Sequence, residues 1–134
     1  MLLKWKDDLL VGVGTIDDQH KELFDMVNKL SEASNTGQSK EVIKDMIDFL
    51  GNYVIDHFSQ EEALQQKYNY PKYTEHKAKH EAFIAQFVDV KNKIEAEGIN
   101  IKYIIQVNQI IATWLVTHVS KVDKELGAFL KDKL

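Results

Sequence analysis

The 134-residue chain contains no cysteine, which excludes disulfide bonds, thiolate metal ligands and iron–sulfur clusters at once. It has one proline and six glycines, so few positions interrupt a helical pattern. No stretch approaches the roughly 20 consecutive apolar residues that a membrane-spanning helix needs. These absences favour one domain, residues 1–134, built from long helices without a membrane span.

The chain also lacks a strong excess of charge of either sign. The chain has 17 Lys and Arg residues against 21 Asp and Glu residues, and they are interspersed, giving a formal net charge of −4. Without a basic stripe to neutralise phosphates, nucleic acid is not an expected partner. The first eight residues have no apolar core of the signal-peptide type, so we expect a cytoplasmic protein. The length allows a core large enough for a monomer that folds on its own.

Apolar residues recur at intervals of three and four along four long stretches, which predicts helices at about 15–34, 39–68, 74–97 and 101–122. A short helix is expected at 126–130, and residues 1–14 are expected to form an ordered arm across the others. Short connections favour antiparallel neighbours. The predicted fold class is therefore all-α: an antiparallel up-down-up-down four-helix bundle with an N-terminal arm and a short C-terminal helix.

Individual residues predict where some of these helices begin and end and which face points inward. Thr15 and Asp18 have the spacing of a capping box, and Thr74 is placed to cap the third helix. Gly98 is expected to end that helix. On the second helix, the periodicity predicts an inward face that includes both Val42 and Phe49.

All five histidines form one spaced set with two carboxylates. The set consists of His20, His57-x-x-x-Glu61, His76-x-x-x-His80, and His118 followed by Asp123. Imidazole nitrogens and carboxylate oxygens are ligands of intermediate metals such as iron, zinc, copper and nickel. In an alternating bundle, the helix ends that carry these residues all lie at the same end of the molecule. The pattern therefore predicts a metal site in the bundle core.

Each part of this pattern has an ordinary alternative. A single histidine on an apolar face, such as His20, is more often a hydrogen-bonded core residue, and a His-x-x-x-His pair occurs by chance on solvated helices. Glu62, beside Glu61, is interpreted as an ordinary surface residue. The joint pattern is the stronger argument, because chance would have to place seven potential ligands on inward faces at one end of one bundle.

The spacing of His118 and Asp123 is irregular for a shared site. Five residues correspond to about 140° around an ideal α-helix, so the two side chains cannot point in one direction from regular helix. Either they approach the site from its two flanks, or the helix widens locally to π-type geometry. The Glu-x-x-His signature of di-iron carboxylate proteins is lacking, which argues against oxidase chemistry.

The number of ligands indicates what a two-metal site would do. Two octahedral ions offer about twelve positions. Five imidazoles, two bridging carboxylates and one bridging oxygen fill all but one of them. A single vacancy among apolar side chains suits a small neutral diatomic molecule. No nucleophile, acid or base for hydrolysis is evident, so the protein is not expected to be an enzyme.

Several stretches together resemble the hemerythrin family, specifically its single-domain bacteriohemerythrins. They are Val11-Gly12-Val13 through Ile16-Asp17-Asp18-Gln19-His20-Lys21, His57-Phe58-x-x-Glu61-Glu62, Tyr70-Pro71-x-Tyr73-x-x-His76-x-x-x-His80, and Trp114-Leu115-Val116-x-His118-x-x-x-x-Asp123-Lys124. The likeness covers nearly the whole chain.

This resemblance implies two iron ions bridged by an oxo or hydroxo group, with dioxygen as a reversible ligand. It assigns His76, His80 and His118 to the coordinatively full iron and His20 and His57 to the iron with the vacancy. Glu61 and Asp123 would bridge the two ions.

The resemblance also bears on two leucines. Leu115 resembles the family's apolar residue that shields bound oxygen in its pocket, although it can also be a plain core leucine. Leu126 replaces an aromatic residue found in several members, which puts the packing around the ligands in doubt.

The function expected from the resemblance is oxygen storage, or oxygen transport to an oxygen-consuming enzyme. Sensing of oxygen or nitric oxide is an alternative, although 134 residues leave no room for an output domain. Another is an enzyme: a di-iron oxidase or peroxidase-like catalyst or, with another metal, a hydrolase.

Overall fold

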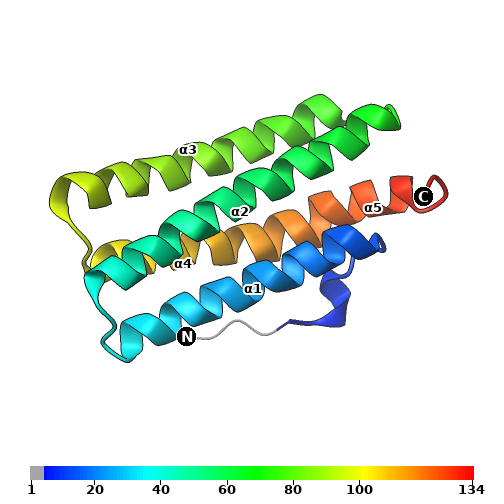
Figure 1. The fold of residues 1–134 in the computed structure, drawn as a ribbon. Coiled ribbons are helices and arrows are strands. Elements are labelled where there is room, and N and C mark those ends of the chain that lie inside the picture. Colours follow the sequence, from blue (N-terminus) through cyan, green and yellow to red (C-terminus); the bar gives the residue numbers. More distant parts are fainter. Residues whose placement is uncertain (1–4) are drawn as a thin grey trace.

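The computed structural model describes residues 5–134, which fold into helices joined by short connections (Figure 1). Among these residues, no helix combines the length and apolar character needed to cross a membrane. The elements, in chain order, are a 3-10 turn η1 (Asp7–Leu9), α1 (Gly14–Asn35), α2 (Lys40–Lys67), α3 (Tyr73–Glu97), α4 (Ile101–Thr113), the π-helical segment η2 (Trp114–Asp123) and α5 (Lys124–Leu130).

The four long helices pack as an antiparallel bundle. Contacts join α1 to α2, α2 to α3, α3 to α4 and α1 to α4, so each helix has two neighbours around a shared core. In Figure 1, α4, η2 and α5 follow one another as a single rod, running from yellow to red. The predicted fold class is confirmed, but the C-terminal helix continues this rod instead of forming a separate element.

The buried face of α2 differs in part from the predicted one, which also included Leu50, Val54, His57 and Glu61, and these four are buried as expected. Val42 and Phe49 were expected to point inward, but they are 42% and 62% exposed. The buried residues follow the stripe that leads through Val54 to His57 and Glu61, and they begin with Ile43, Ile47 and Leu50. Two apolar stripes run side by side on this helix. The bundle buries the stripe that also carries His57 and Glu61.

Both predicted side-chain caps, at Thr15 and Thr74, are wrong. Helix α1 begins at Gly14 after Val13, and α3 begins at Tyr73, so each threonine lies inside its helix and neither forms a side-chain cap. The carboxylate of Asp17 instead accepts hydrogen bonds from the backbone N–H groups of Val11 at 2.7 Å and Gly12 at 3.2 Å. The first turn of α1 therefore holds the preceding arm. The predicted start of the second helix near residue 39 and the predicted end of the third at Gly98 are confirmed, because α2 begins at Lys40 after Ser39 and Gly98 follows the last residue of α3.

The described part of the arm, residues 5–13, lies against the bundle through its apolar side chains. Leu9, Val11 and Val13 are buried. The arm approaches α5 so closely at Gly127 that a Cβ atom there would lie 1.9 Å from the backbone oxygen of Val11. Glycine is therefore required at this contact. Residues 1–4 of the predicted arm lie outside the described residues.

Candidate metal centre

All seven predicted ligand residues meet inside the bundle, where they form what we call the ligand cluster: His20, His57, Glu61, His76, His80, His118 and Asp123. The potential ligand atoms fall into two groups, and within each group these atoms all lie within 4.8 Å of one another. One group comprises Glu61, His76, His80, His118 and Asp123, and the other comprises His20, His57, Glu61 and Asp123. Glu61 and Asp123 belong to both.

Each helix contributes to the cluster through its local geometry. The i,i+4 spacing places His57 and Glu61 on one face of α2, and α3 presents His76 and His80 in the same way. His118 and Asp123 lie in the π-helical segment η2, where an i,i+5 pair shares one face. Of the two geometries that the sequence left open for this pair, the structure shows the π-type widening.

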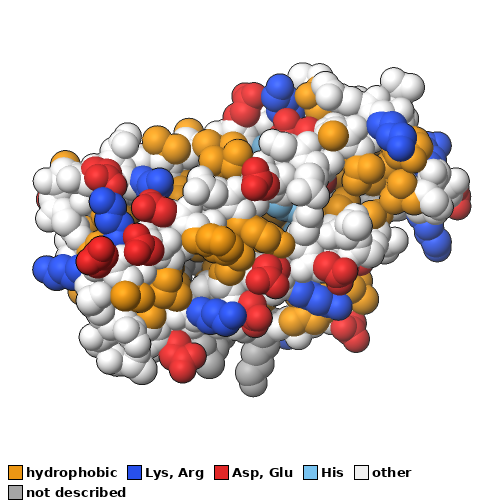
Figure 2. Space-filling view, in the orientation of Figure 1, with side chains coloured by type: hydrophobic (Ala, Val, Ile, Leu, Met, Phe, Trp, Pro, Cys, Tyr) orange, Lys and Arg blue, Asp and Glu red, His pale blue; other side chains and the backbone are white. Residues whose placement is uncertain are grey.

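The cluster is almost completely shielded from solvent. His118 is the most exposed member at 6%, and each of the other six is at most 2% exposed. In the space-filling view, only small pale-blue areas of histidine are visible between white and orange surfaces (Figure 2). Burying two carboxylates in this way is unfavourable unless a compensating charge accompanies them.

In the first group, the imidazoles point their Nε2 atoms at the two carboxylates. The Nε2 atom of His76 lies 2.8 Å from Glu61 Oε1 and 2.9 Å from Asp123 Oδ1. His80 Nε2 lies 3.2 Å from Glu61 Oε1, and His118 Nε2 lies 3.0 Å from Asp123 Oδ1. Three histidines therefore face one oxygen of each carboxylate.

In the second group, two histidines face the other oxygens of the same carboxylates. His57 Nε2 lies 3.0 Å from Glu61 Oε2, and His20 Nε2 lies 3.2 Å from Asp123 Oδ2. The two imidazoles approach each other at 3.0 Å between their Nε2 atoms. Each carboxylate thus turns one oxygen toward each group, and the two groups differ by one histidine.

Two of the histidines are held from behind by side chains on the helix surface. His57 Nδ1 lies 2.6 Å from Gln19 Oε1, and the amide of Gln19 donates to Gln60 Oε1 at 2.6 Å. His80 Nδ1 lies 2.9 Å from Glu62 Oε2. Glu62 was predicted to be an ordinary surface residue, which is wrong, because its position on α2 reaches the back of a histidine on α3. Both residues stand in the stretches that resemble the hemerythrin family, but neither has a spacing that distinguishes it from a solvated residue.

These outer contacts determine which nitrogen carries the proton. A histidine whose Nδ1–H donates to Gln19 or Glu62 presents the lone pair of Nε2 inward. The oxygens of Glu61 and Asp123 have no hydrogen-bond partner among the described residues. Lone pairs and negative oxygens therefore face one another at about 3 Å. Such an arrangement is repulsive unless protons or cations lie between them, so the donor set fits metal ions.

Electrostatics in the cluster favour charged carboxylates. Burial raises the pKa of Glu61, but the neighbouring imidazoles of His57, His76 and His80 outweigh it and hold the pKa well below its usual range. For Asp123, burial and the charge of Glu61 are likewise outweighed by nearby imidazoles, which lower the pKa to about 2. Both groups are thus available as anionic ligands.

The pKa values of His76 and His118, which both belong to the first group, shift in opposite directions. Burial disfavours protonation of His76, yet contact with Asp123 and Glu61 outweighs it and raises the pKa of His76 to about 9. Burial lowers the pKa of His118, and its contact with Asp123 does not fully compensate. The cluster therefore retains a proton on His76 at neutral pH when no metal ion displaces it.

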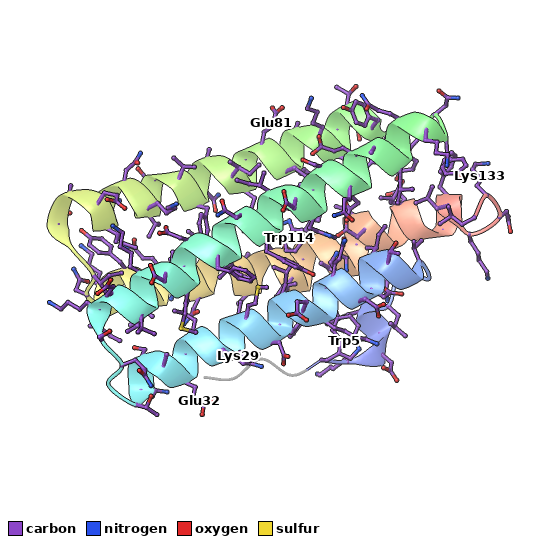
Figure 3. All side chains as sticks on the ribbon, in the orientation of Figure 1. Trp5, Lys29, Glu32, Glu81, Trp114 and Lys133 are labelled. Carbon is purple, nitrogen blue, oxygen red and sulfur yellow. The ribbon has the colours of Figure 1, made fainter. Side chains whose placement is uncertain are left out.

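Aromatic rings pack around the imidazoles. Phe58 stacks on His80 with ring centroids 3.9 Å apart and an interplanar angle of 3°. Trp114 stacks on His118 at 5.1 Å and contacts His20 and His57 edge-on, so it borders both groups. Figure 3 shows Trp114 in the middle of the bundle. These rings fix the orientation of the imidazoles and exclude water.

Taken together, the fold and the cluster define a class: four-helix bundle proteins that build a metal site from side chains on facing helices. Residues 11–130 match the family model described as "Hemerythrin HHE cation binding domain". The chain belongs to the hemerythrin family, as its sequence motifs indicated.

Individual relatives agree with this assignment. Bacteriohemerythrin from Methylococcus capsulatus is 39% identical over 119 residues, which cover 89% of this chain and 88% of that protein. Bacteriohemerythrin from Stenotrophomonas maltophilia is 32% identical over 133 residues, covering 99% of this chain and 84% of the relative. A crystal structure of wild-type hemerythrin superimposes with a TM-score of 0.87 at 36% identity, covering 98% of this chain and 99% of that one.

Proposed function

We propose that this protein binds dioxygen reversibly at a non-haem di-iron centre, for oxygen storage or for delivery to an oxygen-consuming enzyme. Membership of the hemerythrin family supports the oxygen-binding function. The observation that carries the proposal is the division of the ligand cluster into two groups that share both carboxylates.

The proposed ligand roles follow from this division. His76, His80 and His118 would hold one iron ion, His20 and His57 would hold the other, and Glu61 and Asp123 would contribute an oxygen to each. Each carboxylate turns different oxygens toward the two groups, which supports bridging. The group with two histidines offers one ligand fewer than the other, so dioxygen would bind on that side. When bound, the two ferrous ions supply the electrons that reversible capture of dioxygen requires.

The surrounding residues favour binding over catalysis. Phe58, Leu115 and Trp114 are at most 6% exposed, and Phe58 and Trp114 contact the imidazoles directly. Burial of this kind admits a small neutral molecule more readily than a charged or bulky substrate. Leu115 lies in the same π-helical segment as His118, and we assign it to the apolar pocket that keeps water from bound oxygen.

The test is an absorption spectrum of the reduced, iron-loaded protein before and after exposure to oxygen, with the iron content measured in parallel. We expect about two irons per chain and a coloured adduct that disappears when oxygen is removed. Stoichiometric zinc without an oxygen response would favour a hydrolase. Steady consumption of oxygen with a reductant would favour an oxidase. Either result would contradict the proposal.

A further inference from the structure

An open groove of about 720 Å³ runs along the outside of the bundle between α3 and the rod formed by α4, η2 and α5. Its apolar lining includes Phe83, Ile110 and Trp114. The groove is within the size range of small-molecule sites, which are typically about 300–1,000 Å³. It is therefore large enough for an organic ligand much larger than dioxygen.

The groove reaches the ligand cluster at one residue. His118 lines it and is the most exposed member of the cluster. Trp114, which also lines the groove, stacks on His118 and contacts His20 and His57 with its ring edges. The rings of Trp114 and His118 thus form a continuous chain of contacts from the groove to His20 and His57, which is a short path for electrons.

The charges at the groove are opposite in sign to the protein as a whole. Lys79 and Lys121 line it, both are exposed, and neither forms an ion pair with a described residue. The acidic lining residue, Glu125, is paired with Lys72. The chain has a net charge of −4, but the two unpaired ammonium groups give this groove a local positive potential. This potential attracts anions.

We propose that this groove binds an anionic, planar electron donor of the dihydroflavin phosphate class, which restores the ferrous centre after it has been oxidised. The phosphate would lie near Lys79 and Lys121, and the ring system would lie along the apolar lining near Trp114. The reaction step, though not the binding site, depends on the proposed di-iron function.

The electron count of this step is balanced. A dihydroflavin anion releases two electrons and one proton and becomes oxidised flavin. One electron would pass through the ring of His118 or Trp114 to each of the two ferric ions, which would account for both electrons by returning the pair to the ferrous state. The proton is released to solvent at the open side of the groove.

Binding is tested with oxidised flavin mononucleotide, whose fluorescence is followed as the purified protein is added at low ionic strength. We expect saturable binding by the wild type and about tenfold weaker binding by the double variant Lys79→Gln/Lys121→Gln, because two charge contacts with the phosphate are lost. Added salt should also weaken wild-type binding, because it screens the charge contacts with the phosphate. Riboflavin, which has the same ring without phosphate, should bind both proteins equally weakly.

The matched control is Lys29→Gln/Lys40→Gln, which removes two exposed lysines away from the groove. Equal binding by wild type and the groove variant, or an equal loss in the control variant, would overturn the proposal. So would the absence of saturable binding to the wild type.

A second measurement follows the reduction itself, by mixing the oxidised, iron-loaded protein with dihydroflavin mononucleotide without air. The groove variant should lose the absorbance of the oxidised centre more slowly than wild type and control; equal rates would overturn the reductive role. Lysine-dependent flavin binding in a protein that forms no oxygen adduct would instead refute the di-iron function and leave the binding site standing.

Discussion

Gln19 and Glu62 hold two inward-facing histidines by different chemistry. A neutral amide oxygen accepts the Nδ1–H of His57, whereas a carboxylate accepts that of His80. A carboxylate partner makes an imidazole a stronger electron donor than an amide partner does. The two proposed metal positions therefore differ in ligand strength as well as in ligand number.

Replacing Gln19 tests the contribution of the amide. Gln19→Ala should lower iron affinity at the two-histidine position by about 10- to 100-fold, because His57 loses the contact that fixes its tautomer. Competition with a chelator measures this affinity. Gln60→Ala is the matched control and should cause a smaller loss, since the hydrogen bond of Gln60 is with Gln19 and not with a histidine. Unchanged affinity in Gln19→Ala would show that packing alone orients His57.

Leu115 provides a second prediction. It is completely buried, and Leu115→Asn should speed the irreversible oxidation of the oxygen-bound protein severalfold by admitting water to the pocket. The decay of the oxygen adduct's absorbance gives the rate. Leu115→Ile keeps the apolar volume and should leave the rate close to that of wild type. If the asparagine variant decays as slowly as the wild type, Leu115 is a core residue only.

The π-helical segment η2 places His118 and Asp123 on one face of the helix. The sequence shows that their spacing is irregular for an α-helix, but it does not show which geometry accommodates it. His118 and Asp123 are five residues apart, so a regular α-helix would turn them about 140° away from each other. The wider turn brings both onto the cluster and still leaves α5 in line with α4. π-type turns are rare and occur frequently at functional sites, which fits this position.

The docking of the arm on α5 depends on Gly127. Gly127→Ala places a methyl group against the backbone of Val11, so the arm must move or the core must distort. We expect a loss of about 1–3 kcal/mol in the free energy of unfolding. Urea unfolding measures this loss, and the fluorescence of Trp5, which packs edge-on against Phe24, reports movement of the arm.

The matched control for Gly127→Ala is Gly14→Ala, because a Cβ atom at Gly14 would meet nothing within 4 Å. Gly37→Ala is less suitable, because Gly37 has a positive φ that alanine rarely adopts. Equal stability of Gly127→Ala and wild type would show that the arm does not need this close contact.

Much of the architecture could be predicted because each of the four long helical stretches has an apolar stripe with residues spaced three and four apart. The convergence of His20, His57, His76 and His118 also follows from antiparallel packing. The choice between two parallel stripes on α2 could not be predicted, because Val42 and Phe49 are as apolar as Ile43 and Ile47, which are the residues that the bundle buries. Contacts between different helices, such as Glu62 with His80, depend on three-dimensional placement that sequence spacing does not encode.

In the metal-free protein, the cluster should make stability depend on pH. The pKa of His76 is raised to about 9 from an ordinary 6.5, so the folded state binds this proton more tightly than the unfolded state. The resulting stability is fully present below about pH 6.5 and is lost as the pH rises through 9. Urea unfolding of the metal-free protein should therefore give a lower free energy of unfolding at pH 9.5 than at pH 6.5.

The iron-loaded protein is the control, because a metal ion would replace this proton on His76 and remove the effect. Greater stability of the metal-free protein at the higher pH would contradict the assigned role of Glu61 and Asp123 in holding the proton.

The most direct test of the whole account is a crystal structure of the iron-loaded protein with anomalous scattering measured at the iron absorption edge. The account predicts two iron peaks, one within bonding distance of His76, His80 and His118 and the other of His20 and His57, with Glu61 and Asp123 reaching both. A single peak, or any of the five imidazoles turned away from the metal, would contradict it.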